Sequence, residues 1–317
     1  MRAVVIREFG PPEVLEPAEV EEVRAGPDDV VIDVDFANIT FVETQVRAGR
    51  PPHPSMLPAL PAILGNGVGG TVSGSGTGAG RRVVASLNGT GGYAERVVVA
   101  ASRLIDVPAE LALRDAVALL ADGRTALAVA GRADLRAGQT VLIEAAGGGV
   151  GTLLVQLARN AGARVVALAG HPRKLALARD LGADLTVDYR SVGWERQVRD
   201  ATGQVDVVFD GVGGDIGLAA FGLLGAGGQF CPFGMASGSF TPVTPEQAAA
   251  WRVTVRNGAG GSPEELAALA RTALAEAAAG RLRPVIGQEL ELAEAAAAHA
   301  AIEARETIGK TLLTVPR

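Results

Sequence analysis

The chain has 317 residues and a formal net charge of −6; 48% of its residues are hydrophobic, 20% are charged and only 4% are aromatic. This length allows two domains with a sizeable aliphatic core, and the acidic balance argues against a general nucleic-acid binder, which would carry a basic face. No apolar run reaches membrane-spanning length and the N-terminus lacks a signal-peptide pattern, so we expect a soluble cytoplasmic protein without a membrane or nucleic-acid partner.

The first hundred residues are rich in short β-branched runs separated by Gly, Pro and Asp, which is typical of β-strands. We expect these strands at residues 3–6, 30–34, 69–72, 82–85 and 94–99. The segment 65–80 is dense in glycine. Because these glycines are interleaved with valines, they favour bulges and tight turns of a small β-barrel over disorder.

The middle of the chain alternates between strand and helix patterns. After a helix at 113–130 we expect strands at 141–143, 165–168, 185–187, 205–209 and 229–233, with helices that include 173–181 and 217–224. This alternation predicts an α/β fold with a parallel, doubly wound sheet. A further helix begins after Ser262, where Pro263 and two acidic residues follow the capping serine. Helical residues 293–304 and a closing strand at 311–315 end the chain.

Residues 141–151, VLIEAAGGGVG, combine a short apolar strand, a turn of small residues and the start of a helix. Such a unit binds phosphate, because glycine lets the backbone approach a pyrophosphate and the helix N-terminus offers free N–H groups. The spacing is AxxGxxG, with Ala replacing the first Gly of the usual pattern. In a chain with 42 glycines the pattern alone is weak, but a second apolar strand at 164–169 completes a βαβ unit. The candidate turn residues are Ala145, Gly147, Gly148, Gly149, Val150 and Gly151.

Metal chemistry is not expected from this composition. The single cysteine, Cys231, excludes an internal disulfide and a cysteine-rich zinc site. The three histidines, His53, His171 and His299, are scattered along the chain and form no ligand motif. We therefore predict no metal site.

Motifs along nearly the whole chain resemble those of the zinc-free quinone oxidoreductases, the zeta-crystallin-like group of the medium-chain dehydrogenase/reductase superfamily. The markers are the opening MRAVVIREFGPPEVL, Arg47-Ala48-Gly49, Gly92-Tyr93-Ala94, Gly123-Arg124-Thr125-Ala126, the turn at 145–151, Leu181-Gly182-Ala183-Asp184, Phe209-Asp210-Gly211-Val212-Gly213 and Ile308-Gly309-Lys310-Thr311. The resemblance implies a Rossmann dinucleotide-binding domain, residues 116–258, inserted in a GroES-like β-barrel catalytic domain built from residues 1–115 and 259–317.

The end of the second strand of the βαβ unit indicates which cofactor is bound. NAD-preferring folds place an acidic residue there to hold the ribose hydroxyls, whereas this chain reads Ala169-Gly170-His171. The absence of a carboxylate removes repulsion against a 2′-phosphate and favours NADPH. The resemblance places Lys174 and Tyr189 at positions that hold this phosphate, with Gly170, His171 and Arg173 as nearby candidates; a solvated helix face is the other interpretation of Lys174 and Arg173.

The resemblance also implies contacts on the nicotinamide side of the cofactor. Thr125 matches a threonine near the nicotinamide, and Arg256 and Asn257 are candidates from the C-terminal side. Two further loops follow the fourth and fifth strands, for which ordinary loop packing is the alternative role. Their residues are Gly211, Val212, Gly213, Phe233 and Gly234.

The substrate side departs from the family pattern. Bacterial members often carry Asn where this chain has Thr40, tyrosines where it has Gln45 and Pro51, and a Glu near Gly67 that is missing here. The nearest polar candidates for the substrate site are Thr40, Asn38, Gln45 and Asn66, each of which could equally serve the barrel structurally. Asp122 and Glu144 lie near the cofactor motifs, where capping or solvation is an alternative role.

The favoured function is NADPH-dependent hydride transfer to a small-molecule quinone or related conjugated carbonyl without a metal, since the cofactor carries this chemistry. The alternatives are an enoyl-thioester reductase of polyketide or fatty-acid type and a non-catalytic NADPH-binding structural or RNA-binding protein. Family members are commonly homodimers joined through a sheet edge. Residues 251–256 alternate β-branched residues where that edge should lie, so we expect a homodimer with Val253 and Val255 near its axis.

Overall fold

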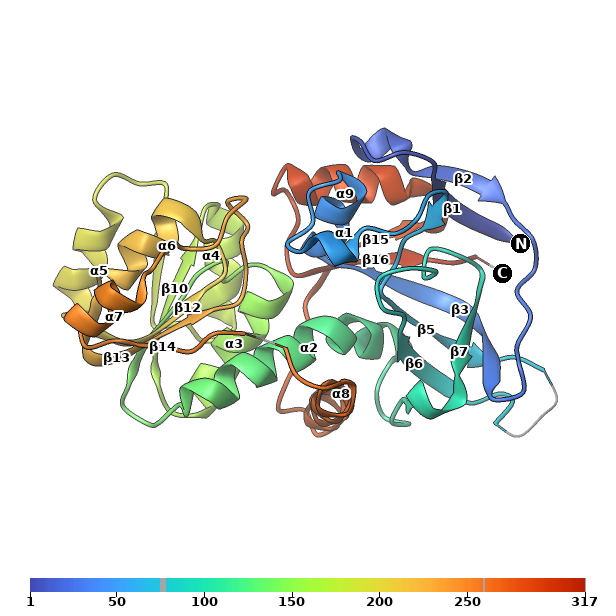
Figure 1. The fold of residues 1–317 in the computed structure, drawn as a ribbon. Coiled ribbons are helices and arrows are strands. Elements are labelled where there is room, and N and C mark those ends of the chain that lie inside the picture. The colour runs from blue at the N-terminus through green and yellow to red at the C-terminus, as the bar shows by residue number, and fades with distance from the viewer. Residues whose placement is uncertain (75–77, 259, 317) are drawn as a thin grey trace. The chain divides into compact units, whose positions relative to one another are not determined.

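The computed structural model describes residues 1–74, 78–258 and 260–316, shown as a ribbon in Figure 1. Its contacts divide the chain into two compact units. We call Met1–Ala121 together with Ala270–Arg317 the end unit, and Asp122–Leu269 the central unit. The sequence suggested divisions after residues 115 and 258. The contacts place them inside helices α2 (Leu113–Ala133) and α8 (Pro263–Ala278), where a continuous helical pattern gives the sequence no break to detect.

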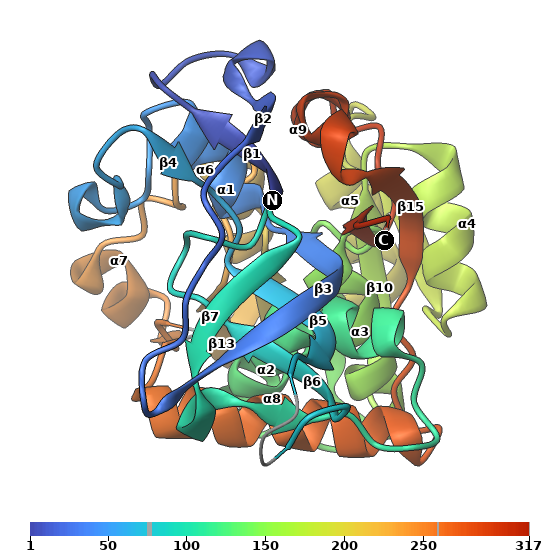
Figure 2. The same cartoon turned by 90° about the vertical axis from the view of Figure 1, so that its right-hand side faces the viewer.

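The end unit is built from both ends of the chain and contains two sheets. The smaller sheet has the order β2 (Glu16–Glu19), β1 (Arg2–Ile6) and β4 (Ala62–Ile63). The larger has the order β15 (Ile286–Glu291), β16 (Lys310–Thr314), β3 (Asp29–Ile39), β5 (Gly67–Val72), β6 (Arg82–Ser86) and β8 (Ile105–Asp106), and β7 (Arg96–Ala100) also pairs with β3. Figure 2 shows β3 and β7 side by side. The expected β-rich GroES-like fold of both chain ends is confirmed, although β2 and β15, which are rich in Glu and lack β-branched runs, were not predicted.

The larger sheet bends where its longest strand meets a glycine. The pairing of β3 with β5 shifts register between Val34 and Phe36. Gly70 lies at this point, and a Cβ added to it would be 2.0 Å from the carbonyl oxygen of Asp33. Only glycine permits this close approach of two backbones. Residues 67–72 of the glycine-dense segment therefore form strand β5, and the extra residue of the bulge, Asp35, lies in its partner β3.

The remaining helices of the end unit are short. They are α1 (Phe41–Arg47), α9 (Ala295–Glu303) and the 3-10 turns η1 (Pro12–Val14), η2 (Pro54–Met56), η3 (Ala101–Arg103) and η4 (Leu292–Glu294). Buried hydrophobic residues from both chain ends pack into one cluster among the described residues of this unit, including Ile6, Ile32, Val68 and Leu313. Because this core joins β1 to β16, the two chain ends must fold together.

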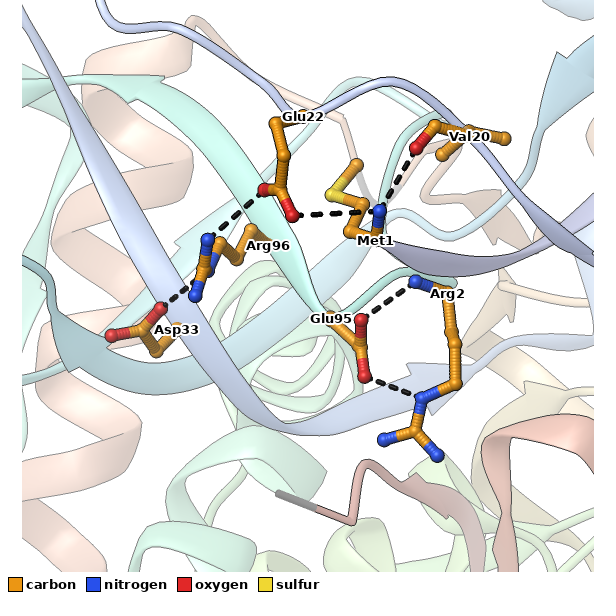
Figure 3. A network of polar contacts seen from close by, with 7 residues as sticks. All are labelled: Met1, Arg2, Val20, Glu22, Asp33, Glu95 and Arg96. Atoms are coloured by element: carbon orange, nitrogen blue, oxygen red, sulfur yellow. Dashed lines mark hydrogen bonds and ion pairs between the residues drawn. The ribbon is translucent and has the colours of Figure 1, made fainter.

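Exposed ion pairs hold the start of the chain on the end unit (Figure 3). The amino group of Met1 lies 3.5 Å from the carboxylate of Glu22, which also accepts a 3.0 Å bond from Arg96. Arg96 in turn donates to Asp33 at 3.0 Å. Because these groups are solvated, the network contributes more to the position of the terminus than to stability.

The central unit contains one six-stranded sheet in which every neighbouring pair is parallel. Its order is β11 (Leu185–Asp188), β10 (Arg164–Ala169), β9 (Thr140–Ile143), β12 (Val205–Asp210), β13 (Leu224–Pro232) and β14 (Thr254–Val255). Its helices include α3 (Gly149–Asn160), α4 (Pro172–Asp180), α5 (Trp194–Thr202), α6 (Gly214–Phe221) and α7 (Pro245–Ala250). The predicted doubly wound α/β sheet is confirmed, and its strand order reverses direction at β9, between β10 and β12.

Three elements of the central unit differ from the sequence prediction. The helix predicted at 217–224 is α6, which starts at Gly214 because Gly213 at its N-cap adopts a positive φ of 75°. The strand predicted at 229–233 is β13, which starts earlier, at Leu224, although residues 225–228 are Gly and Ala. The edge strand predicted over 251–256 is reduced to Thr254–Val255, and Val253 packs into the core of its own unit.

Candidate cofactor and substrate sites

The glycine turn after β9 is shaped by close backbone packing. A Cβ added to Gly151 would lie 2.2 Å from the carbonyl oxygen of Ala145, so the first turn of α3 rests directly on the turn. Gly148 caps α3 in an extended conformation and donates its N–H to Ala145 at 2.8 Å. Ala145 itself has a φ of +48°, a left-handed conformation that glycine would adopt with less strain. The predicted tight turn between β9 and α3 is therefore formed, with Ala in a position suited to Gly.

The structure brings the expected phosphate-binding side chains together at the carboxyl ends of β9, β10 and β11. A Cβ on Gly147 would lie 2.5 Å from the Cβ of Lys174, so the lysine stem covers the glycine turn. A Cβ on Gly170 would lie 3.0 Å from the hydroxyl oxygen of Tyr189. Glycine at both positions leaves room for these two side chains, whose polar ends are a cation and a phenol.

The start of α4 adds to the positive character of this edge. The ring Nδ1 of His171 accepts the N–H of Arg173 at 3.2 Å and so caps the helix, with Pro172 as its first residue. His171 and Arg173 are exposed. A helix N-terminus carries a partial positive charge, so the whole edge suits an anion.

The loops after β12 and β13 pack against each other. A Cβ on Gly211 would lie 2.5 Å from the ring of Phe233, and one on Gly234 would lie 2.6 Å from the carbonyl oxygen of Gly211. Gly213 has a φ of +75°. The structure therefore brings the predicted residues of these two loops into contact with each other at the carboxyl edge of the sheet.

Glu144 and Asp210 contact the loop after β12 and are both fully buried. The N–H of Val212 lies 3.1 Å from a carboxyl oxygen of each of them. Asp210 also accepts from the N–H of Gly213 at 2.7 Å and from the hydroxyl of Thr241 at 2.5 Å. Sequence reasoning noted Glu144 only as a capping or solvated residue. Glu144 follows directly after an apolar strand, and Asp210 ends another. This position is the sequence signal by which the burial of both residues could have been recognised.

The remaining predicted cofactor residues lie on α2 and around β14. Thr125 lies half-buried in α2, and the carboxylate of Asp122 lies beside Gly149 at the start of α3. Arg256 donates to the side chain of Gln229 at 3.0 Å, and Gln229 binds the carbonyl of Ala133 at the end of α2. The side chains of Arg256 and Gln229 therefore form a hydrogen-bonded chain that ends at the last residue of α2. Asn257, which follows it, is exposed.

The substrate candidates of the end unit are organised by Glu43, which sequence reasoning did not single out. Its buried carboxylate accepts the N–H of Thr40 at 2.6 Å, the hydroxyl of Thr40 at 2.8 Å and the N–H of Asn66 at 2.9 Å. Burial raises the pKa of Glu43, and the hydrogen bonds from Thr40 oppose that rise. Thr40 and Asn66 are thus held together, 26 residues apart in the sequence.

Behind Glu43 lies a buried chain of polar side chains. The hydroxyl of Tyr93 lies 3.0 Å from Nε2 of His299, and it also bonds to Glu43. If the tyrosine donates to the carboxylate, the imidazole donates from Nε2, which leaves Nδ1 as a buried acceptor without a partner. Burial, together with the charge of Arg47, lowers the pKa of His299 to about 3. The histidine is therefore a neutral part of the core.

The other two substrate candidates have structural contacts. Asn38 is fully buried, and its amide donates to the carbonyl of Val117 at 3.2 Å. A Cβ on Gly67 would lie 2.6 Å from that amide nitrogen, which explains glycine there. Gln45 donates to the hydroxyl of Thr44 at 3.1 Å. Asn38 thus serves the packing of α2 on β5.

Two kinds of feature are absent from the described part of the chain. No group of three or more His, Cys, Asp or Glu residues there could hold a metal ion. No helix there is long and apolar enough to cross a membrane.

Comparisons with known proteins agree with this architecture. Residues 26–109 match the family model described as the alcohol dehydrogenase GroES-like domain, and residues 149–275 match the one described as zinc-binding dehydrogenase. A quinone oxidoreductase of Pseudomonas aeruginosa is 32% identical over 96% of this chain and 97% of its own. A 2-haloacrylate reductase of a Burkholderia species is 30% identical over 98% of both chains. A mycobacterial protein solved in complex with NADPH superposes with a TM-score of 0.88, at 31% identity over 99% of this chain and 100% of its own.

A GroES-like unit formed by the two chain ends, with a dinucleotide-binding parallel sheet between them in sequence, defines a medium-chain dehydrogenase/reductase. Within that superfamily, the chain belongs to the quinone oxidoreductase family. The protein is therefore an oxidoreductase, and the resemblance drawn from its motifs is confirmed.

Proposed function

We propose that this protein transfers a hydride from NADPH to a quinone or a related conjugated carbonyl, without a metal ion. One observation carries the cofactor part of the proposal: Lys174 and Tyr189 pack on Gly147 and Gly170 at an edge where β10 ends without an acidic residue. A quinone oxidoreductase and a 2-haloacrylate reductase among the relatives support an electron-poor conjugated acceptor.

The residues at the carboxyl edge fit an NADPH molecule. Gly147 and Gly151 leave no space for side chains and expose backbone to a pyrophosphate, while the start of α3 offers N–H groups. The ammonium of Lys174 and the hydroxyl of Tyr189 would bind the 2′-phosphate. Asp188, the acidic residue that precedes Tyr189, forms an ion pair with Arg190 at 2.9 Å, so its negative charge is compensated.

The loops after β12 and β13 would hold the nicotinamide end. When bound, NADPH supplies the hydride, and the protein's part is to position the acceptor and exclude water. Reduction of a quinone would take one hydride from NADPH and one proton from solvent, and it would give the hydroquinone and NADP⁺. Thr40 and Asn66, held by Glu43, are the polar groups that we assign to the acceptor side.

Steady-state assays at the nicotinamide absorbance test this proposal. We expect NADPH oxidation with at least one member of a panel of quinones, enones and 2-haloacrylate, and slower turnover with NADH. Turnover of an enoyl thioester but of no quinone would favour the thioester reductase. Cofactor binding without turnover of any acceptor would favour a non-catalytic role.

The metal-free part of the proposal has its own test. Dialysis against a chelator should leave the activity unchanged, because the chain has one cysteine, Cys231, and no clustered histidines. Loss of activity that zinc restores would contradict it.

A further inference from the structure

The buried carboxyl groups of Glu144 and Asp210 are brought together by the register of the sheet. Strands β9 and β12 pair in parallel with Ile143 opposite Phe209, and the N–H of Glu144 donates to the carbonyl of Phe209 at 3.0 Å. One further residue along each strand sets Glu144 beside Asp210, at the carboxyl edge. Both side chains are fully buried, so two acids from separate strands share one site without solvent.

The hydrogen bonds around the pair are unequal. Asp210 accepts from Gly213, from the Thr241 hydroxyl and from Val212. Glu144 has only the shared N–H of Val212, and its Oε1 is buried without a partner. A buried charge needs several donors, so Asp210 is the member suited to carry the charge. A protonated Glu144 would instead donate a hydrogen bond to Asp210.

The electrostatics agree with this assignment. Burial, and then the charge of Asp210 with the hydrogen bond between the two groups, raise the pKa of Glu144 well above its ordinary value. Asp210 is the titratable group that acts on Glu144 among the described residues. The groups that donate hydrogen bonds to the pair are neutral: the N–H groups of Val212 and Gly213 and the hydroxyl of Thr241.

The pair lies beneath a loop that matters for the cofactor. The strand order reverses between β10 and β12, and dinucleotides bind at such reversals, outside the carboxyl ends of the strands. Val212 and Gly213, whose N–H groups the pair binds, belong to the loop that follows β12 at this place. The position of that loop therefore depends on two carboxyl groups that repel each other if both are ionised.

We propose that Glu144 and Asp210 share one proton at neutral pH, and that this proton positions the loop of residues 211–213 for NADPH. Both are positioning residues: they act through the backbone of the loop. The inference rests on the proposed function for its cofactor, but the shared proton itself does not.

Glutamine and alanine at position 144 separate this role from simple packing. In Glu144→Gln the amide can donate to Asp210 and its carbonyl can accept from Val212, as a protonated Glu144 does. In Glu144→Ala both bonds are lost. Asp200→Asn, at an exposed carboxylate in α5 of the same unit, controls for the change of net charge.

Two measurements on the full chain test the proposal. The first is the infrared C=O stretch of a protonated carboxyl group at pH 7 without cofactor, which we expect in wild type and Asp200→Asn and expect to lose an identifiable component in Glu144→Gln. The second is NADPH affinity by fluorescence titration. We expect Glu144→Gln to keep the wild-type dissociation constant within about twofold. We expect Glu144→Ala to raise it about tenfold or more, because it loses two buried hydrogen bonds and the loss of one alone costs about that much.

The outcomes are distinguishable. If no infrared component depends on Glu144, the shared proton is refuted, whatever NADPH does. If the component is present but Gln and Ala weaken NADPH binding equally, the positioning role is refuted. If wild type does not bind NADPH, the proposed function fails while the infrared result still decides the shared proton. Should Glu144→Gln not fold, Asp210→Asn replaces it, because an amide there can also bond to Glu144 without a second charge.

Discussion

The buried histidine of the end unit makes a quantitative prediction about acid stability. His299 has an ordinary pKa of 6.5 when unfolded and one of about 3 in the folded protein, because burial and the charge of Arg47 disfavour its cation. Below pH 6.5 the unfolded chain binds a proton that the folded chain does not, so the free energy of unfolding falls as the pH falls. Each pH unit lowers the free energy of unfolding by about 1.4 kcal/mol, so protonation of His299 in the unfolded chain lowers it by about 2 kcal/mol between pH 6.5 and 5.

The variant His299→Gln should abolish this loss. Its amide nitrogen stands in for Nε2 and can donate to Tyr93, but it does not titrate. Urea unfolding at pH 7 and pH 5 should therefore show a smaller loss for the variant, by about 2 kcal/mol. The transition must be followed by far-ultraviolet circular dichroism, because Trp194 and Trp251, the two tryptophans, both lie in the central unit.

His53→Gln is the matched control, because this histidine is exposed in a loop of the same unit. It should leave the acid dependence unchanged. Histidine-selective NMR gives a direct reading: the imidazole of His299 should not titrate down to about pH 4. A titration midpoint near 6.5 for His299, or equal acid losses in wild type and His299→Gln, would refute the reasoning.

Three further predictions concern the central unit. Lys174→Ala should weaken NADPH binding roughly 10- to 100-fold and NADH binding little, because it removes a charge-assisted contact to the 2′-phosphate worth about 1.5–3 kcal/mol. Equal losses of affinity in titrations of both cofactors would contradict this prediction. Ala145→Gly should raise the free energy of unfolding by about 0.5–1 kcal/mol, because relief of the left-handed strain exceeds the added entropy of the unfolded chain. A lower free energy of unfolding for the variant, measured by urea unfolding with tryptophan fluorescence, would contradict this prediction. We also predict a two-fold dimer through β14, with twice the 32.2 kDa chain mass in light scattering. Thr254→Arg should give a monomer because Thr254 is exposed, whereas Val253 is buried in its own unit and is unsuitable for this test. A dimer that Thr254→Arg leaves intact would refute this edge.

The architecture of the central unit was accessible from local patterns. Strands and helices with periods of about two and 3.6 residues are recognised within ten residues, and glycine marks where a turn must allow close approach. The phosphate-binding turn at 145–151 and the acid-free end of β10 followed from such signals. The left-handed φ of Ala145 did not, because nothing near it in the sequence signals the conformation.

The edge of the sheet shows where local patterns fail. Alternating β-branched residues at 251–256 predicted a full strand, yet only Thr254 and Val255 pair with β13. Val253 instead enters the core, and Arg256 reaches back to Gln229. Which of these residues pairs, packs or stays exposed depends on the elements beside them.

The sequence by itself determined the fold class, the family and the place of the glycine turn, because each is written in short-range spacing and composition. The charge and the hydrogen-bond partners of the buried polar groups were decided only by the tertiary structure. Glu144 meets Asp210 across 66 positions, and Tyr93 meets His299 across 206. A carboxyl or imidazole group keeps or loses its charge according to its burial and its nearest donors, and the fold brings those neighbours from distant parts of the chain.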